Sequence, residues 1–232
     1  MSDTSVEPVV RARLGPRPGD PGAAQLALLD HPMVPGAADV GGWVAEARRR
    51  RFRALRTSAL FGPAARPFLD QGFEPVDRLT LLERSLRSVR TRRRRPATRR
   101  MRTRDLEAAA RVDRQAFGLA WGNDAESLLD IRRATPHHRS RVIGDSTVDG
   151  FAISGRAGTT GYIQRLAVDP ARQREGLGRV LVHDAIDWMI RHRVATALVN
   201  TGVDNDRALA LYASEGFVVR PDELVVLELS LD

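Results

Sequence analysis

The sequence predicts an α/β fold, in which strands and helices alternate, and two adjacent patterns carry this prediction. Residues 162–168 alternate apolar and polar side chains, as is typical of a strand. Asp169-Pro170 ends that strand, because proline lacks a backbone donor and favours extended geometry in the residue before it. From Leu177 onward the apolar residues recur at helical spacing. A strand therefore leads into a helix through a turn at residues 173–178.

That turn carries glycines at positions 176 and 178. The start of a helix exposes about four unpaired N–H groups and roughly half a positive charge. Glycine has no Cβ to hold a ligand away from these groups, so the turn predicts a site for a phosphate-bearing ligand. A Walker loop would need a lysine, of which the chain has none, and a dinucleotide-binding fingerprint would need glycine in place of Leu181.

Residues 205–217 form a second pattern, N-D-R-A-L-A-L-Y-A-S-E-G-F. Asn205 and Tyr212 are two helical turns apart, so they project from one helix face about 10 Å apart along its axis. Gly216 is expected just beyond the helix end, and Phe217 at the start of the next strand. This pattern and the glycine turn resemble motifs B and A of the GNAT superfamily of N-acetyltransferases, and the core is similar to that of its ribosomal-protein alanine acetyltransferases.

The resemblance implies the GNAT fold, a mixed and mostly antiparallel twisted sheet whose central strands splay apart and whose faces are covered by helices. It also implies acetyl-CoA as co-substrate and no metal. Tyr212 matches the family's general acid, and a hydroxyl of pKa ~10 is suited to protonate a thiolate whose conjugate acid has a pKa of ~8.5. The residues implied to bind acetyl-CoA are those of the turn, of the preceding strand end and of the second motif: Gln173, Arg174, Glu175, Gly176, Leu177, Gly178, Arg179, Leu166, Ala167, Val168 and Asn205.

On the acceptor side the residues expected to line the pocket are Trp121, Gln164, Arg165 and Asn200. The arginine suggests an acceptor that carries a carboxylate or another anion. Asn200 stands where related enzymes carry a glutamate, and an amide side chain cannot act as a base. Deprotonation of the amine is therefore left either to a water chain or to a residue within 121–138.

The composition limits the class of protein. A chain of 232 residues can form one large domain or two small ones. It has no apolar run of 18 residues and no signal-peptide pattern, so we expect a cytoplasmic protein without a membrane span. The absence of cysteine excludes disulfides, thiolate metal sites and cysteine nucleophiles. All 37 basic residues are arginine, and residues 1–100 hold 20 of them against 10 acidic residues, so the net charge of +8 arises in the front of the chain.

The front of the chain also contains a predicted internal repeat. Residues 68–73 and 79–86 match residues 212–217 and 224–231, so we interpret residues 25–87 as a degenerate half of a GNAT domain. Phe68 stands in the place of Tyr212, which excludes proton donation there. We expect a loose segment over residues 1–24, an Arg-rich linker over 88–97 and the catalytic domain over 98–232. The basic stretch 87–102 is interpreted as a solvated linker or as a contact for RNA or another polyanion.

The remaining elements follow from local patterns. We expect helices over residues 39–53, 103–117 and 123–134. Thr103 is placed to cap the second helix, and Asn123-Asp124-Ala125-Glu126 opens the third. Asp149-Gly150 predicts a hairpin turn. Strands are expected over residues 26–29, 99–102, 141–144, 151–155 and 195–199.

Two classes of function stay open on this evidence. The first is an N-acetyltransferase that moves an acetyl group from acetyl-CoA to a primary amine, of a small molecule or of a protein N-terminus, by direct transfer in a ternary complex. Tyr212 favours this function. The second is a catalytically weak acyl-CoA-binding module with a basic, polyanion-contacting front half, and Asn200 favours it. A tandem-GNAT synthase of a thiol cofactor is disfavoured by the incomplete front copy. We expect a monomer or a homodimer.

Overall fold

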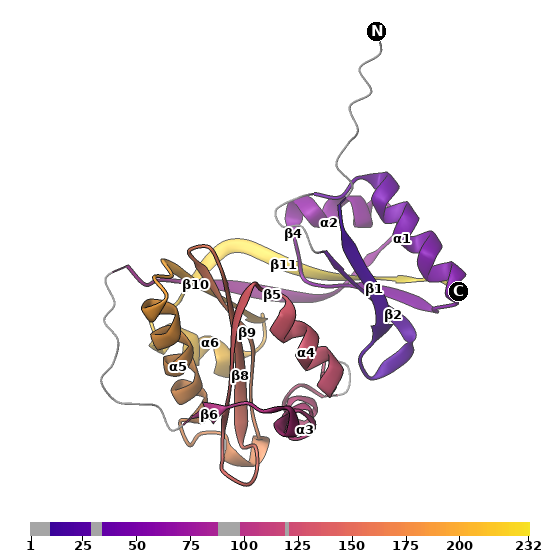
Figure 1. Ribbon diagram of the computed structural model, residues 1–232. Coiled ribbons are helices and arrows are strands. Elements are labelled where there is room, and N and C mark those ends of the chain that lie inside the picture. Colours follow the sequence, from indigo (N-terminus) through magenta and orange to yellow (C-terminus); the bar gives the residue numbers. More distant parts are fainter. Residues whose placement is uncertain (1–9, 29–33, 88–97, 119–120) are drawn as a thin grey trace. The chain divides into compact units, whose positions relative to one another are not determined.

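The computed structural model describes residues 10–28, 34–87, 98–118 and 121–232, which form two compact units (Figure 1). The first unit takes in the described residues up to Thr80 together with Asp222–Asp232, and the second is Leu81–Pro221. Two strands, β5 (Glu74–Ser85) and β11 (Val218–Ser230), each run from one unit into the other. The expected linker over residues 88–97 lies outside the described residues.

The first unit is a sheet with two helices. Its elements are β1 (Ala12–Arg17), β2 (Asp20–Leu28), α1 (Ala37–Arg49), β3 (Ala54–Thr57), β4 (Leu60–Phe61) and α2 (Gly62–Leu69). Strand β2 pairs antiparallel with β1 and parallel with β3, and β11 pairs antiparallel with β3 and β4. Apolar side chains of both helices and of the strands form one buried core, which includes Val40, Val44, Leu55, Phe68 and Leu227.

The prediction that residues 1–24 are loose is wrong for the described part of that segment. Strand β1 and the start of β2 occupy it, and Ala23 and Ala24 are buried. The prolines and glycines that suggested a loose segment are tolerated because β1 is the end strand of the sheet, where Pro16 removes no ladder hydrogen bond that the sheet needs.

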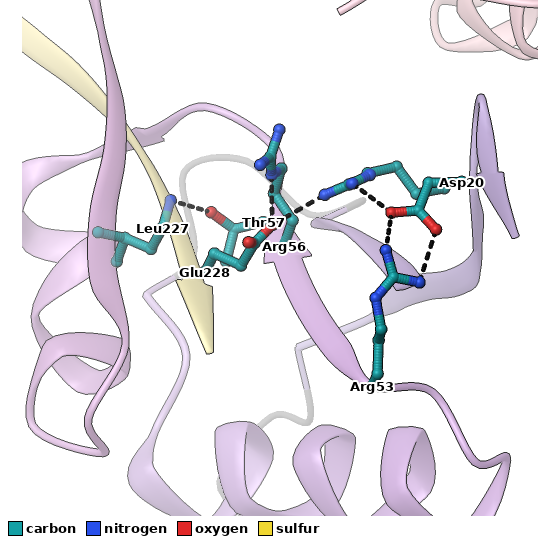
Figure 2. A network of polar contacts seen from close by, with 7 residues as sticks. Asp20, Arg53, Arg56, Thr57, Leu227 and Glu228 are labelled. Atoms are coloured by element: carbon teal, nitrogen blue, oxygen red, sulfur yellow. Dashed lines mark hydrogen bonds and ion pairs between the residues drawn. The ribbon is translucent and has the colours of Figure 1, made fainter. Parts of the chain in front are cut away.

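Polar contacts hold the C-terminal strand in the first unit (Figure 2). Glu228 on β11 accepts hydrogen bonds from Arg17 at 2.9 Å and from Arg56 at 2.6 Å. Asp20 accepts from Arg53 at 2.8 Å, and this hydrogen bond lowers the pKa of the Asp20 carboxyl below its ordinary value. Arg17 also contacts Asp20, so one arginine joins the two carboxylates.

Thr57 binds the backbone of β11 between the residues of β11 that pair with β4 and those that pair with β3. Its hydroxyl oxygen accepts a hydrogen bond from the Leu227 N–H at 3.0 Å, and its side chain is 1% exposed. Thr57→Val keeps the shape but leaves this N–H unpaired, so we expect the free energy of unfolding to fall by about 1–3 kcal/mol. Urea denaturation measures the change. Thr57→Ser, which keeps the hydroxyl, should lose less, and a Val variant as stable as the parent would contradict the assignment.

The second unit holds strands β6 to β10 together with the end of β5 and the start of β11, and helices lie on both faces. Its elements after β5 are β6 (Arg99–Arg100), α3 (Leu106–Phe117), α4 (Ala125–Arg133), β7 (His137–Ile143), β8 (Gly150–Ala157), β9 (Thr160–Val168), α5 (Leu177–Arg191), β10 (Thr196–Gly202) and α6 (Asp206–Ser214). Strands β6 to β9 pair antiparallel in order, and β9 pairs parallel with β10. Figure 1 shows α5 on one side of the β8–β9 hairpin and α3 and α4 on the other. The predicted fold, a mixed and mostly antiparallel sheet flanked by helices, is confirmed.

Local predictions in this unit had mixed outcomes. Asp124 caps α4 as expected, because its side chain accepts from the Ser127 N–H at 2.8 Å. Thr103 does not cap; instead the buried carboxylate of Asp105 accepts from the Arg102 N–H and pairs with Arg99. The hairpin predicted at Asp149-Gly150 is present, because β7 and β8 pair antiparallel, but its connection is longer than a tight turn. Strand β7 ends at Ile143 and β8 begins at Gly150, so six residues connect them.

The second unit begins at Leu81. The sequence predicted that the catalytic domain begins later, at residue 98. Leu82 and Leu86, from the end of β5 and just beyond it, lie in one buried cluster with Trp188 and Tyr212. The Leu86 N–H donates to the Ala195 carbonyl at 2.8 Å. A chain shortened to residues 98–232 would therefore lack part of the core that surrounds Tyr212.

The two units share one detail that supports the predicted repeat. Helix α2 ends before Gly72, whose φ is 86°, and α6 ends before Gly216, whose φ is 79°. After each glycine a phenylalanine meets the aromatic ring of its helix edge-on, at 5.2 Å in the Phe68–Phe73 pair and 5.6 Å in the Tyr212–Phe217 pair. The common ancestry of the two segments as half-GNAT copies stays a prediction.

Candidate functional site

The central strands separate part-way along their length. Strands β9 and β10 pair from Thr160↔Thr196 to Ile163↔Val199, and among the described residues they share no pair beyond that point. Strand β9 continues to Val168 on its β8 side, after a register shift in which Gln164 is the extra residue. The backbone of Leu166, Ala167 and Val168 therefore has a ladder partner on one side only, as the expected splay requires.

Beyond Val168 the chain forms the predicted turn. The Asp169 side chain accepts from the Ala171 N–H at 2.9 Å, and α5 begins after Gly176. Gly176 has φ of 81°, a left-handed conformation that favours glycine, and a Cβ built there meets nothing within 4 Å. The backbone at the helix start thus faces open space, which fits a phosphate-bearing ligand.

Glu175, within this turn, forms an ion pair with an arginine. Arg172 pairs with Glu175 at 2.9 Å and with Asp149 at 3.1 Å. The hydrogen bond from Arg172 holds the pKa of the Glu175 carboxyl below its ordinary value. Glu175 is therefore ionised but compensated, so its repulsion of an anion at the turn is reduced.

Side chains on α6 and at its end contact the turn and the start of α5. Arg179 pairs with Glu215 at 3.0 Å, and Arg207 donates to the Gln173 Oε1 at 3.0 Å. His183 also contacts the buried Glu215, at 2.7 Å. Glu215 and His183 were not identified from the sequence, because nothing local in the chain indicates that a residue at the end of α6 meets α5.

Tyr212 lies at the point where the strands part. Its side chain is 5% exposed and shares a buried cluster with Ile163 and Val199, the last residues of the β9–β10 ladder. Burial raises the pKa of the Tyr212 hydroxyl well above its ordinary value, and the positive charge of Arg165 partly opposes this. The hydroxyl therefore stays protonated at neutral pH.

Asn205 caps the helix that carries Tyr212. Its Oδ1 accepts from the Ala208 N–H at 3.1 Å, so at least this oxygen serves the helix. Gly178, on α5, lies close to both α6 and the end of β9. A Cβ built there would lie 3.2 Å from Leu211 Cδ2 and 3.9 Å from Val168 Cγ2. The turn, the end of β9 and α6 therefore converge.

The four residues expected on the acceptor side do not form one group of free side chains. Arg165 is paired with the fully buried Asp113, so the expected recognition of a substrate anion by Arg165 finds no support in the contacts. The Gln164 Nε2 donates to the Ile131 carbonyl at 3.0 Å. Trp121 is 37% exposed, and Asn200 is exposed on β10.

His138 lies within residues 121–138, where a base was expected, and its contacts indicate its protonation state. Its Nε2 accepts a hydrogen bond from the Arg132 Nε at 3.0 Å, which requires a neutral ring. Burial and the positive charges of Arg132 and Arg100 lower the pKa of His138. His138 is thus neutral at pH 7, and like His137 it is exposed.

Comparison with known proteins agrees with this geometry. The model of the Acetyltransferase (GNAT) family matches residues 109–217, which include the turn and Tyr212. A [Ribosomal protein bS18]-alanine N-acetyltransferase of Salmonella typhimurium is 31% identical over 121 residues, which cover 50% of this chain and 76% of that protein. The chain belongs to the GNAT family. It is an acetyl-CoA-dependent acyltransferase of the N-acetyltransferase type.

Two further GNAT proteins extend the comparison. The N-alpha-acetyltransferase RimI of Mycobacterium tuberculosis is 33% identical over 120 residues, 49% of this chain and 72% of that protein. The structure of a tandem GNAT protein from the clavulanic acid biosynthesis pathway has a TM-score of 0.63 and 16% sequence identity, and covers 97% of this chain and 79% of that chain. At this identity the second similarity concerns the fold alone.

The described residues also bear on metal binding and on membrane insertion. No group of three or more His, Cys, Asp or Glu side chains in that part of the chain is arranged to hold a metal ion. Within the same residues, no helix combines the length and the apolar character that crossing a membrane requires.

Proposed function

We propose that this GNAT protein transfers the acetyl group of acetyl-CoA to a primary amine, by direct attack within a ternary complex. The observation that carries the proposal is the convergence at one place of the open edge of β9, the Gly176 turn and the buried Tyr212. The N–H groups of the turn would bind the pyrophosphate, and the free edge of Leu166, Ala167 and Val168 would pair with the pantetheine arm.

The residues then have separate tasks in the transfer. A backbone N–H at the open edge of β9 would polarise the thioester carbonyl. The amine nitrogen forms a bond to the carbonyl carbon, the bond from that carbon to sulfur breaks, and Tyr212 donates its proton to the leaving sulfur. The nitrogen loses one proton to solvent water and Tyr212 is reprotonated from solvent, so acetyl-CoA and amine yield amide and free thiol.

The absence of a carboxylate at Asn200 favours one class of amine. With no base at this position, the rate depends on the fraction of amine that is already neutral. An α-amino group with a pKa of about 8 is neutral to a useful extent at pH 7, whereas a lysine side chain at about 10.4 is not. We therefore infer a protein N-terminus as the acceptor, in agreement with the names of the bS18-alanine and N-alpha relatives.

Release of free thiol from acetyl-CoA tests this function. Peptides with a free N-terminus and no lysine should stimulate the release, while the same peptides with a blocked N-terminus and one added lysine should not. Binding of acetyl-CoA without stimulated release by any amine would contradict the proposal. That result would favour the acyl-CoA-binding module as the function instead, because Asn200 leaves the site without a base.

A further inference from the structure

The buried ion pair between Asp113 and Arg165 has no task in the transfer described above. Asp113, on α3, is 0% exposed. Its Oδ1 accepts from the Arg165 Nε at 2.7 Å, and its Oδ2 accepts from the Arg165 Nη2 at 2.7 Å. This geometry is bidentate, which fixes the orientation of both side chains as well as their distance.

The same two side chains make three hydrogen bonds to Trp121 and Asn123, in the part of the α3–α4 connection next to α4. The Arg165 Nη2 donates to the Trp121 carbonyl at 2.8 Å. Asp113 accepts from the backbone N–H of Asn123 at 2.7 Å and from its Nδ2 at 3.1 Å. The guanidinium carbon lies 3.6 Å from the centre of the Phe117 ring, at the end of α3. The placement of Trp121 and Asn123 beside the end of α3 therefore depends on one ion pair.

The position of Arg165 joins this connection to the reacting strand. Arg165 directly follows the bulge residue Gln164, where β9 has left β10. Replacing a buried ion pair by apolar residues is often neutral or stabilising, so such a pair is weak evidence for a role in stability. Its contacts are directed at the connection, which indicates that its role is to place that segment.

We propose that Asp113 and Arg165 are positioning residues that hold residues 121–123, the part of the α3–α4 connection next to α4, against β9 and so shape the acceptor side of the site. Neither residue contacts the Gly176 turn in the described hydrogen bonds and ion pairs, so acetyl-CoA binding should not depend on them. This inference rests on the proposed function for its kinetic consequence, but its structural consequence can be measured without any reaction.

Asp113→Asn tests the proposal, with Asp105→Asn as a matched control. Asp105 is also buried and also paired with an arginine through two hydrogen bonds, at 2.8 and 2.9 Å from Arg99, but it does not touch the α3–α4 connection. In Asp113→Asn we expect the KM for the peptide amine to rise about tenfold or more, while the Kd for acetyl-CoA changes less than twofold. Asp105→Asn should leave both constants within twofold.

Hydrogen exchange supplies the readout that is independent of catalysis. The amide of Asn123 donates to Asp113 and that of Gly122 to the Gly118 carbonyl. Both should exchange at least about tenfold faster in Asp113→Asn and unchanged in Asp105→Asn, with α5 equally protected in both. If Asp113→Asn does not fold, Arg165→Lys keeps the charge but cannot make the fork of hydrogen bonds, and the same pattern is expected.

The outcomes separate the two proposals. Unchanged exchange of Gly122 and Asn123, or equal acceleration in the Asp105 control, would overturn the positioning role. An unchanged KM together with faster exchange would also overturn it, because the connection would then not serve the acceptor. If the parent protein transfers no acetyl group to any peptide, the proposed function fails, and the exchange measurement still decides whether the ion pair holds the connection.

Discussion

Gly176→Glu is expected to weaken acetyl-CoA binding by at least about 30-fold. At φ of 81° a side chain costs about 1–2 kcal/mol, and a carboxylate about 4 Å from a bound phosphate adds from about 1 to 4 kcal/mol of repulsion. Each 1.4 kcal/mol corresponds to about tenfold in affinity. Calorimetric titration of acetyl-CoA measures the loss directly.

Two variants isolate the cause of this loss. Gly176→Ala has the backbone strain without the charge, so it should lose only about tenfold. Gly158→Glu places the same side chain at another glycine with positive φ and open surroundings, in the turn between β8 and β9, and should bind acetyl-CoA as the parent does. If acetyl-CoA raises the melting temperature of Gly176→Glu as much as that of the parent, the turn does not bind the pyrophosphate.

Tyr212→Phe is expected to lower kcat by about 10²–10⁴-fold, the usual contribution of a positioned acid, with little change in the Kd for acetyl-CoA. The substitution removes only the hydroxyl and keeps the ring against Phe217. Since burial raises the pKa of Tyr212, the hydroxyl stays protonated over the whole neutral and mildly alkaline range. Single-turnover kinetics with saturating acetyl-CoA measure the acetyl-transfer step.

The second tyrosine of the chain provides the control. Tyr162 lies on β9 within the paired part of the ladder, opposite Leu198. Tyr162→Phe should reduce kcat by less than about tenfold, because its hydroxyl has no assigned part in proton transfer. An equal loss of acetyl-CoA affinity and turnover in Tyr212→Phe would show that this tyrosine is structural, and the proton would then have to come from another group.

Local patterns in the sequence predicted the elements on which the proposed acetyl-CoA site is built. The alternation of residues 162–168, the stop at Asp169-Pro170 and the glycine before α5 each follow from backbone preferences of a few neighbouring residues. The helix that carries Tyr212 and its end before Gly216 were recognisable for the same reason, whereas the capping role of Asn205 came from the structure. These elements form wherever such residues occur, because the interactions that define them span four residues or fewer.

Only the tertiary structure decided which distant residues meet. Asp113 and Arg165 are 52 positions apart, and the sole hint in the sequence is an acidic residue on the otherwise apolar face of α3. Leu82 belongs to the buried core around Tyr212, and Leu227 belongs to the core of the first unit. Local patterns in the sequence do not predict these assignments either. Strand order and ion pairs depend on contacts between segments, and periodicity along one segment carries no information about its neighbour.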